Sequence, residues 1–308
     1  MKETLLLSII IVNYNGKRFL GDCLDSVAKH VSCSHEIILV DNASSDGSCE
    51  FVREHFPEVR LVESKVNTGF TGGNNIGAKQ ASGRLILLLN NDTIMLNDFS
   101  PALQAMDDPA IGALGCKLCF ADGRLQPSYG YAHSPMRLML FWSGIGNALK
   151  WLQASKLVET DPECYERLQH GMAWVSGAFL LTRRSLWEKL GGLDESYFMY
   201  VEDVDFCARV STAGFEIAYI PDVLVLHYAG YGRPWIGITG LMNSVKSYLV
   251  YTKKFHDPVG VLCLRMGLSL IMFLRAIGYG AGGLFLRSVV LKEKNRGYLS
   301  ASLNLLKG

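Results

Sequence analysis

Four stretches of the 308-residue chain carry side chains that could perform chemistry. They are Asp41 in ILVDNASSDGS, Asp92 at the end of LLLNNDT, the acids Glu202, Asp203 and Asp205 in YVEDVDF, and His227 at the end of VLVLH. A carboxylate can accept a hydrogen bond from a ligand, hold a divalent cation or take a proton, and an imidazole can ligate a metal. These stretches lie far apart in the sequence, so the fold must bring them together.

The elements that would position these residues are visible as an alternation of aliphatic runs and helix-like stretches from residue 5 to about 120. The aliphatic runs are LLLSIIIV, EIILV, VRLVE and LILLL, and the helix-like stretches cover residues 18–30, 46–56 and 73–81. Near-continuous Val, Ile and Leu between helices is typical of strands buried on both faces. The pattern predicts an α/β fold with a Rossmann-like, mostly parallel sheet flanked by helices.

Polar residues follow these strands at their carboxyl ends. They are Asn13, Tyr14 and Asn15 after the first strand, Asp41 and Asn42 after the second, and Asn90, Asn91 and Asp92 after the fourth. Ligands of doubly wound sheets bind at the carboxyl edge. We therefore predict a binding site at this edge.

Asp41 has two interpretations. Its carboxylate can accept the imide N–H of a uracil or thymine, or it can cap the helix expected to begin near Asp46. Ser44 and Asp46 are themselves good capping residues, which favours nucleobase recognition by Asp41.

The glycine-rich stretch NTGFTGGNNIG, residues 67–77, resembles a phosphate-binding loop that precedes a helix, although it is not a Walker motif. A glycine such as Gly72 lets the backbone approach a ligand closely, and Asn74 and Asn75 can donate hydrogen bonds to ribose or phosphate oxygens. The alternative is a turn with a helix cap.

The acids of YVEDVDF lie at an expected helix start, where negative charge interacts favourably with the helix dipole. The same position could also supply a general base. His227, taken alone, is more often a structural residue than a ligand.

The ordered set of motifs resembles a known family. IIIVNYNG, ILVDNASSDGS, NTGFTGGNNIG, LLLNNDT, VSGAFLLTRRSLWEKLGGLDESYFMYVEDVDFCARVSTAGF and VLHYAG are similar to those of the family 2 inverting glycosyltransferases with the GT-A fold, most closely the bacterial rhamnosyltransferase-type branch. The resemblance covers about residues 5–232. It implies transfer of a sugar, with L-rhamnose favoured, from a nucleoside-diphosphate donor of the dTDP or UDP type. The implied acceptor is a saccharide or polyprenyl-linked molecule of cell-surface polysaccharide synthesis.

The resemblance also implies roles for individual residues. Asp203 matches the general base of the family, with Glu202 as the second choice, and Asp205 is expected to support its helix. Asp92 and His227 would ligate Mg²⁺ or Mn²⁺, and Asp41 would bind the base of the nucleotide.

One departure from the family pattern concerns the metal. Family members usually carry two aspartates separated by one residue, whereas this chain has Asn90, Asn91 and Asp92. We expect Asn90 to hydrogen-bond the nucleotide or orient Asp92, and the metal to bind weakly without nucleotide. Arg233 is expected to contact the diphosphate or an anionic acceptor.

Two rival functions remain at this point. A nucleotidyltransferase would also use an α/β sheet, a glycine-rich loop and a metal carboxylate, but it predicts a G-x-G-x-R-like loop after the first strand, where this chain has NYNG. A catalytically inactive nucleotide-sugar-binding protein is disfavoured by the intact Asp92, Asp203 and His227.

Composition narrows the partners and the compartment. The formal net charge of +1 argues against a general nucleic-acid binder. The eight cysteines lack the dense framework of a small secreted domain, which favours reduced thiols in the cytoplasm. Cys116 and Cys119 have no second pair to complete a zinc site, so we expect them in a strand.

We divide the chain into a nucleotide-sugar-binding half (1–120), an acceptor-binding and catalytic half of the same domain (121–239) and a helical extension (240–308). In the extension Arg265, Arg275 and Arg287 would fall within an arc of about 120° on one continuous helix. This favours a helix lying in the membrane interface, peripheral on the inner face of the cell membrane. A packed hydrophobic hairpin and a membrane span are the alternatives.

Overall fold

The computed structural model describes residues 5–145, 156–228, 237–285 and 287–307. The chain forms two compact units. The first, the sheet unit, comprises Met1–Tyr131, Val158–Phe198 and Glu202–Ala229. The second, the helical unit, comprises Ala132–Leu157, Met199–Val201 and Gly230–Gly308.

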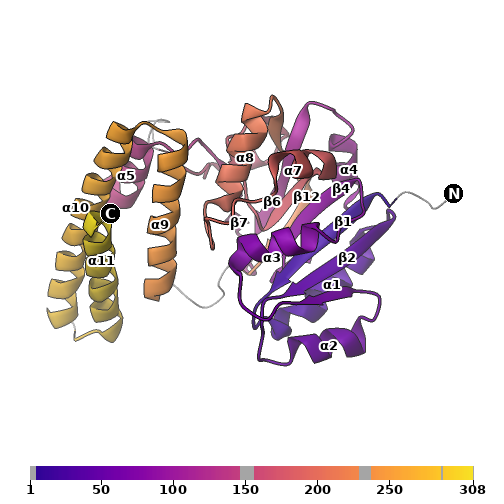
Figure 1. Ribbon diagram of the computed structural model, residues 1–308, viewed down its shortest axis with the longest axis horizontal. Coiled ribbons are helices and arrows are strands. Elements are labelled where there is room, and N and C mark those ends of the chain that lie inside the picture. The colour runs from indigo at the N-terminus through magenta and orange to yellow at the C-terminus, as the bar shows by residue number, and fades with distance from the viewer. Residues whose placement is uncertain (1–4, 146–155, 229–236, 286, 308) are drawn as a thin grey trace. The chain divides into compact units, whose positions relative to one another are not determined.

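The sheet unit is built on one large sheet with the strand order β3-β2-β1-β4-β11-β6-β12-β5 (Figure 1). Its strands are β1 (Leu7–Asn13), β2 (His35–Asp41), β3 (Arg60–Glu63), β4 (Leu85–Asn90), β5 (Thr93–Met95), β6 (Ile111–Cys119), β11 (Phe179–Arg183) and β12 (Glu216–His227), with β7 (Leu125–Gln126) on β6 and β9 (Gln169–His170) on β12. The first four are parallel, as predicted. β11 lies antiparallel between β4 and β6, so the sheet as a whole is mixed.

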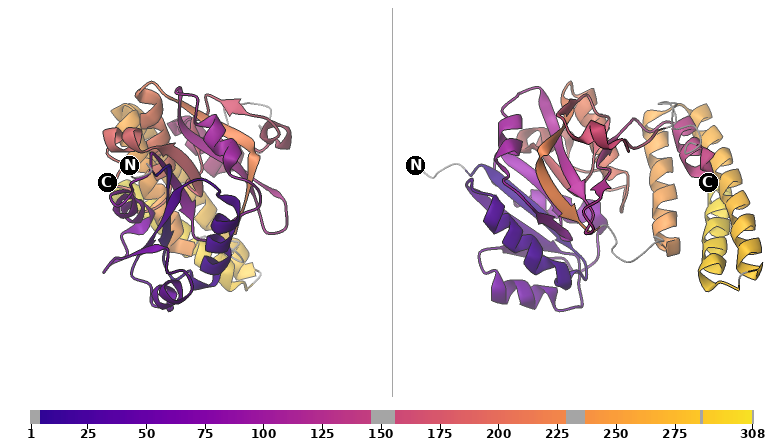
Figure 2. Two further views of the ribbon diagram at one scale, coloured as in Figure 1. Left: turned by 90° about the vertical axis from the view of Figure 1, so that its right-hand side faces the viewer. Right: turned by 180° about the vertical axis from the view of Figure 1, so that it is seen from behind.

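Helices cover both faces of this sheet, because successive residues of β1 point to opposite sides. Leu7, Ile9 and Ile11 join the buried cluster that contains Leu20 and Leu24 of helix α1 (Lys17–His30). The opposite face packs against helix α3 (Gly69–Ala78). Figures 1 and 2 show α1 and α3 on opposite sides of the strands.

The glycine-rich stretch forms helix α3 itself, so the prediction of a loop with a helix beginning at Gly73 was wrong. A Cβ atom on Gly73 would come within 2.6 Å of Val12, and one on Gly77 within 2.5 Å of Ile10. The glycines therefore let the helix backbone lie directly against β1. Gly69, with φ of +74°, begins the helix in a left-handed conformation that glycine adopts readily.

The second half of the sheet unit supplies the remaining elements. They are α2 (Ser48–His55), α4 (Ser100–Ala105), α7 (Arg184–Leu190), α8 (Glu202–Thr212), a short 3₁₀ helix (Pro162–Tyr165) and a two-stranded sheet of β8 (Tyr129–Gly130) and β10 (Trp174–Val175). Residues 216–227 form the single strand β12, which shifts register against β6 between Ile220 and Leu224. Cys116 and Cys119 lie in β6, as predicted.

The helical unit contains α5 (Pro135–Ser143), α9 (Gly237–Phe255), α10 (Pro258–Phe285) and α11 (Val289–Lys307). Helix α5, which we had assigned to the acceptor-binding half, packs on α10, where Met139 lies against Gly267. Among the described residues, α10 is the one helix whose length and apolar composition would allow it to cross a membrane.

The predicted arc of three arginines is wrong, because it assumed one continuous helix. Arg287 follows the end of α10. Arg265 Nε donates to the Leu305 carbonyl over 3.1 Å, and Arg275 Nη1 donates to the Tyr298 hydroxyl over 3.3 Å. Both side chains are therefore engaged with α11.

Candidate active site

The carboxyl ends of β1, β2 and β4 meet in a network of polar side chains. Asn13 is fully buried and lies beside Asp41 in the parallel register of β1 and β2. Its Nδ2 donates to Asp41 Oδ1 over 2.9 Å, and its Oδ1 accepts a hydrogen bond from Asn91 Nδ2 over 2.7 Å. The three predicted strand-end stretches are thus brought together, as the sequence indicated.

Several of these predicted ligand-binding residues also hold the fold. Asp41 is 2% exposed and accepts hydrogen bonds from both Asn13 and the Ser44 amide. Asn42 donates to the Gly69 carbonyl and accepts from Thr68, so it ties β2 to the start of α3. Recognition of a nucleobase by Asp41 stays a prediction.

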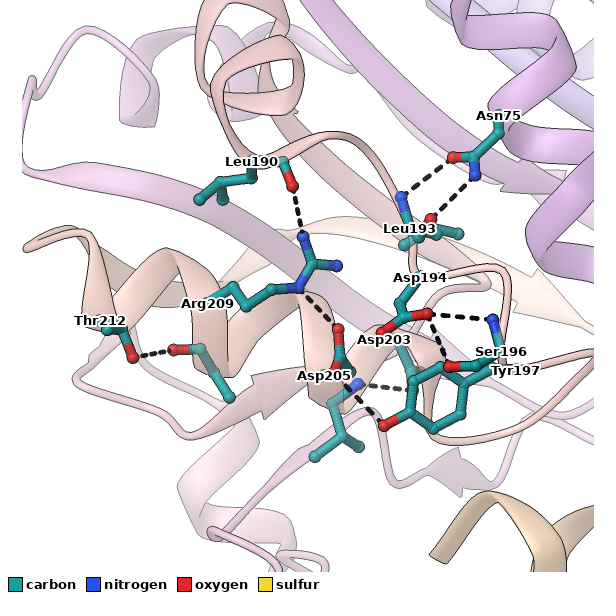
Figure 3. Close-up of polar contacts among 12 residues, drawn as sticks. Asn75, Leu190, Leu193, Asp194, Ser196, Tyr197, Asp203, Asp205, Arg209 and Thr212 are labelled. Atoms are coloured by element: carbon teal, nitrogen blue, oxygen red, sulfur yellow. Dashed lines mark hydrogen bonds and ion pairs between the residues drawn. The ribbon is translucent and has the colours of Figure 1, made fainter. Parts of the chain in front are cut away.

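The asparagines predicted from the glycine-rich stretch also form hydrogen bonds that hold the fold. Asn75 Nδ2 donates to the Leu193 carbonyl, and Asn75 Oδ1 accepts from the Leu193 amide (Figure 3). Asn75 Nδ2 also donates to Glu195. Asn74 is buried and donates to the Phe70 carbonyl. These contacts occupy both donor hydrogens of Asn75, and at Gly72 the position of a Cβ atom is taken by the Thr68 side chain. Ligand binding by Gly72, Asn74 and Asn75 stays a prediction.

Two other predicted residues are more open. Tyr14 is 54% exposed, and Asn15 is exposed and binds Ser44 and Ser45 at the turn after β2. Arg233 lies outside the described residues.

Asp92 and His227 approach each other at the end of β4. His227 Nε2 lies 3.3 Å from Asp92 Oδ1, with the two side chains 12% and 18% exposed. The pairing of β12 with β5 holds them there, because His227 is in register with Thr93. Asn90 Nδ2 lies 3.1 Å from the same imidazole nitrogen.

The other nitrogen of His227 meets a residue that the sequence analysis missed. Gln126 in β7 places its Nε2 atom 3.1 Å from His227 Nδ1. Its Oε1 atom is buried and has no hydrogen-bond partner among the described residues. Only the hairpin that follows β6 brings Gln126 here, and nothing in the local sequence indicates it.

Asp203 lies in the first turn of α8, as predicted. Its Oδ2 accepts a hydrogen bond from the Gly177 amide over 2.9 Å and its Oδ1 from the Val204 amide over 2.8 Å. Burial raises the pKa of the Asp203 carboxyl above its ordinary value, although the two amides act in the opposite direction. A carboxyl with a raised pKa is suited to take a proton near neutral pH.

The preceding acid, Glu202, is 5% exposed, and its Oε2 has no hydrogen-bond partner within the described parts of the chain. The pKa of Glu202 is well above its usual range, mainly because the carboxyl is buried and also because Asp203 lies beside it.

Asp205 has the supporting role that we expected. It is fully buried, pairs with Arg209 Nε over 2.7 Å and accepts a hydrogen bond from the Tyr197 hydroxyl over 3.3 Å (Figure 3).

Strand β11 connects Asp203 with the end of β4. Gly177, which donates to Asp203, is followed by Ala178, whose carbonyl accepts a hydrogen bond from the Asn90 amide over 3.1 Å. A Cβ atom on Gly177 would lie 3.2 Å from Phe70 and 3.6 Å from Asp203 Cβ, so a side chain here would crowd the site. Nothing in the sequence around Gly177 indicates this role.

Backbone strain gathers around the same motifs. Four of the five non-glycine residues with positive φ in the described chain are Asn15, Ala43, Tyr200 and Val201. The first two follow β1 and β2, and the other two immediately precede Glu202. Such conformations cost about 1–3 kcal/mol each and are common at functional sites.

Comparison with known proteins identifies the family. A family model described as Glycosyl transferase family 2 matches residues 8–190, which is more than half of the chain. The chain belongs to glycosyl transferase family 2. The protein is therefore a glycosyltransferase, and the nucleotidyltransferase alternative is set aside.

Two of the curated relatives are rhamnosyltransferases. The chain is 28% identical over 275 residues to the N-acetylglucosaminyl-diphospho-decaprenol L-rhamnosyltransferase of Mycobacterium tuberculosis, covering 82% of this chain and 85% of that protein. It is 26% identical over 235 residues to the rhamnosyltransferase WbbL of Escherichia coli K12, covering 73% and 84%. Within family 2, the chain is thus rhamnosyltransferase-like.

Solved structures confirm the GT-A-like fold. The mannosyltransferase PcManGT of Pyrobaculum calidifontis, solved with GDP-Man and Mn²⁺, matches with a TM-score of 0.57 at 16% identity, covering 98% of this chain and 87% of that one. TarS of S. aureus, residues 1–349, solved with UDP, matches with a TM-score of 0.52 at 14% identity, covering 99% and 92%.

Proposed function

We propose that this glycosyltransferase is metal-dependent and inverting, and that it moves L-rhamnose from a dTDP- or UDP-linked donor to a lipid-linked saccharide. The observation that carries the proposal is the convergence at the end of β4. Asp92 and His227 lie within 3.3 Å of each other, and Asp203 is connected to the same strand end through Gly177 and Ala178. A cation site and a proton acceptor beside one strand end suit a metal-assisted inverting transfer.

Asp92 and His227 fit a divalent cation. One carboxylate oxygen and one imidazole nitrogen are ligands that Mn²⁺ accepts, and Mg²⁺ also binds through one or two carboxylates plus substrate phosphates. Among the described residues no group of three or more Asp, Glu, His or Cys side chains could hold the ion alone. In this proposal the donor diphosphate would complete the coordination, and the bound ion would neutralise the charge of the departing diphosphate.

Gln126 would fix the imidazole of His227 for this purpose. Rotating the Gln126 amide by a half-turn brings its unpartnered Oε1 to the position 3.1 Å from His227 Nδ1. There it accepts the Nδ1 hydrogen, which leaves the Nε2 lone pair directed toward Asp92. Such outer hydrogen bonds commonly set the tautomer of a metal-binding histidine.

Asp203 would take the proton of the acceptor hydroxyl while that oxygen attacks the anomeric carbon and the bond to the diphosphate breaks. Its raised pKa and its fixed position, held by the Gly177 and Val204 amides, support this role. Glu202 is buried, and burial together with the neighbouring Asp203 raises the pKa of its carboxyl, so we assign it as a neutral neighbour. A single displacement of this kind inverts the anomeric configuration.

The similarity to two rhamnosyltransferases supports the choice of sugar, and one of these acts on a diphospho-decaprenol substrate. That likeness supports a polyprenyl-linked acceptor in cell-surface polysaccharide synthesis. An acceptor of this kind would place the protein on the cytoplasmic face of the cell membrane.

A panel of nucleotide sugars tests the proposal. Each would be incubated with the full chain and an N-acetylglucosaminyl diphosphate lipid analogue, with Mn²⁺, Mg²⁺ or EDTA. We expect nucleoside-diphosphate release with dTDP- or UDP-rhamnose that requires both metal and acceptor. Equal release in EDTA would contradict the metal, and preference for another sugar would contradict the donor.

A further inference from the structure

Helix α10 has an exposed face that carries no polar side chain. Its exposed large apolar residues are Val259, Leu262, Met266, Leu270, Phe273, Leu274 and Ile277, each between 46% and 69% exposed. At 100° per residue these positions fall within an arc of about 120°. Among the described side chains of α10, no charged residue is exposed. We call this surface the α10 apolar face.

The other side of α10 is covered within the helical unit. Leu264, Leu268, Met272 and Ala276 are buried at the spacing of one helix face. Helix α11 runs along this side, where the Ser269 and Ser302 hydroxyls lie 3.1 Å apart and Asn295 donates to the Ala276 carbonyl over 2.7 Å. Figure 1 shows α10 on the side of the unit away from α9. The apolar face is therefore an outer surface of this unit.

The charge of this region is strongly asymmetric. Residues 240–308 contain ten Lys and Arg against two Asp and Glu, a formal charge of +8, whereas the rest of the chain has twenty against twenty-seven, a charge of −7. Exposed cations lie beyond both ends of α10, with Lys253 and Lys254 before it and Arg287, Lys292 and Arg296 after it. An exposed apolar strip with cations nearby can combine insertion of apolar side chains with attraction to anionic lipid headgroups.

We propose that the α10 apolar face inserts in the plane of an anionic lipid bilayer, with the flanking cations at the lipid phosphates. A second copy of the chain is a poorer occupant, because pairing two such faces would bring together two copies of the segment 240–308, each with a formal charge of +8. A transmembrane orientation would place Arg265 and Arg275 in hydrocarbon, where a guanidinium is strongly disfavoured. In the plane, both arginines stay with α11.

Membrane binding by α10 would hold the protein at the surface where the proposed lipid-linked acceptor lies. Only this purpose of the binding rests on the proposed function. The test of membrane binding uses no substrate. Loss of vesicle binding and loss of sugar transfer are therefore distinguishable results.

Vesicle flotation of the full chain measures the binding. We expect the protein to float with vesicles of phosphatidylglycerol and phosphatidylcholine and to remain unbound with phosphatidylcholine alone. The triple variant Met266→Glu, Leu270→Glu, Phe273→Glu should lose at least tenfold in vesicle affinity. The matched control, Val66→Glu and Leu168→Glu, also replaces half-exposed apolar residues but lies in the sheet unit, and it should bind as the unmodified chain does. Each of Lys292→Gln and Arg296→Gln should weaken binding about fivefold.

The depth of α10 in the bilayer and the oligomeric state of the protein distinguish in-plane insertion from a membrane span and from pairing with a second copy of the chain. Cys263 is the one exposed cysteine of the eight and lies on α10, so a polarity-sensitive fluorophore can be attached there, with Cys263→Ser as the unlabelled control. We expect the fluorescence emission of the label to shift to the blue with anionic vesicles. Lipids brominated near the headgroup should quench the label equally at Cys263, at Leu270→Cys and at Ile277→Cys. Deepest quenching at residue 270 would show a span and overturn the proposal. Equal flotation of all variants would also overturn the proposal. The same holds if the protein is a dimer without lipid and the triple substitution makes it a monomer but leaves flotation unchanged.

Discussion

The imidazole of His227, at the end of β12, lies 3.3 Å from the carboxylate of Asp92, at the end of β4. The two residues come together because β5, which begins directly after Asp92, pairs with β12 in antiparallel register. This contact turns two separate sequence motifs into one candidate cation site.

Replacing Asp92 with Ala removes the only carboxylate of this pair. We expect Asp92→Ala to abolish transfer and to remove the thermal stabilisation produced by Mn²⁺ together with a nucleoside diphosphate, which is about 2.7 kcal/mol at a hundredfold excess over Kd. Differential scanning fluorimetry of both proteins measures this. Asp98→Ala, an exposed acid after β5, is the control and should keep the full shift. A full shift in Asp92→Ala would exclude the metal assignment.

Replacing Gln126 separates a positioning role from a packing role. Gln126→Leu keeps the side chain's bulk but cannot accept the Nδ1 hydrogen of His227, so Mn²⁺ affinity in the presence of nucleoside diphosphate should fall about tenfold or more. Gln126→Glu supplies an acceptor and should restore the affinity. Titration followed by Mn²⁺ electron paramagnetic resonance reports this without turnover. Equal affinities in all three proteins would show that Gln126 does not act on the metal.

Asp203→Asn keeps the shape of the side chain but cannot accept a proton. We expect turnover to fall by roughly a hundredfold or more while nucleotide and metal affinity persist. Glu202→Gln should keep most of the activity. In the unmodified enzyme kcat/KM should rise with pH through an apparent pKa above the ordinary 3.8 of an aspartate. If Glu202→Gln were the inactive variant, the base would be Glu202.

Burial of Glu202 also has a consequence for stability. Its folded-state pKa is raised, so the folded protein binds this proton more tightly than the unfolded chain does, and stability falls as pH rises above about 4.5 until the raised pKa is passed. Glu202→Gln removes this loss. The variant should match the unmodified chain near pH 4 and become more stable than it at pH 7 and above. Urea denaturation at both pH values measures the difference, and a constant difference would contradict the burial effect.

Strand patterning was enough to predict the parallel half of the sheet and the edge at which Asn13, Asp41 and Asn91 meet. The reason is physical, since buried parallel strands must be aliphatic on both faces and ligand-edge residues must follow them. The glycine-rich stretch misled us because glycines serve both phosphate-binding loops and close helix packing, and only the contact of Gly77 with Ile10 distinguishes the two.

The roles of Gln126 and Gly177 could not be predicted, because each depends on a long-range pairing. Gln126 reaches His227 only through the β6–β7 hairpin, and Gly177 reaches Asp203 only because β11 starts where β4 ends. The arginines of α10 were misassigned for a similar reason. A helical wheel cannot show that α11 covers the side on which they lie.

The anomeric configuration of the product tests the central claim most directly. The full chain would be incubated with Mn²⁺, the active nucleotide sugar from the donor panel and the N-acetylglucosaminyl diphosphate lipid analogue, and the product followed by NMR from its first appearance. A single displacement assisted by Asp203 predicts a new glycosidic bond whose configuration at C1 is opposite to that of the donor. A product that retains the donor configuration would contradict this account.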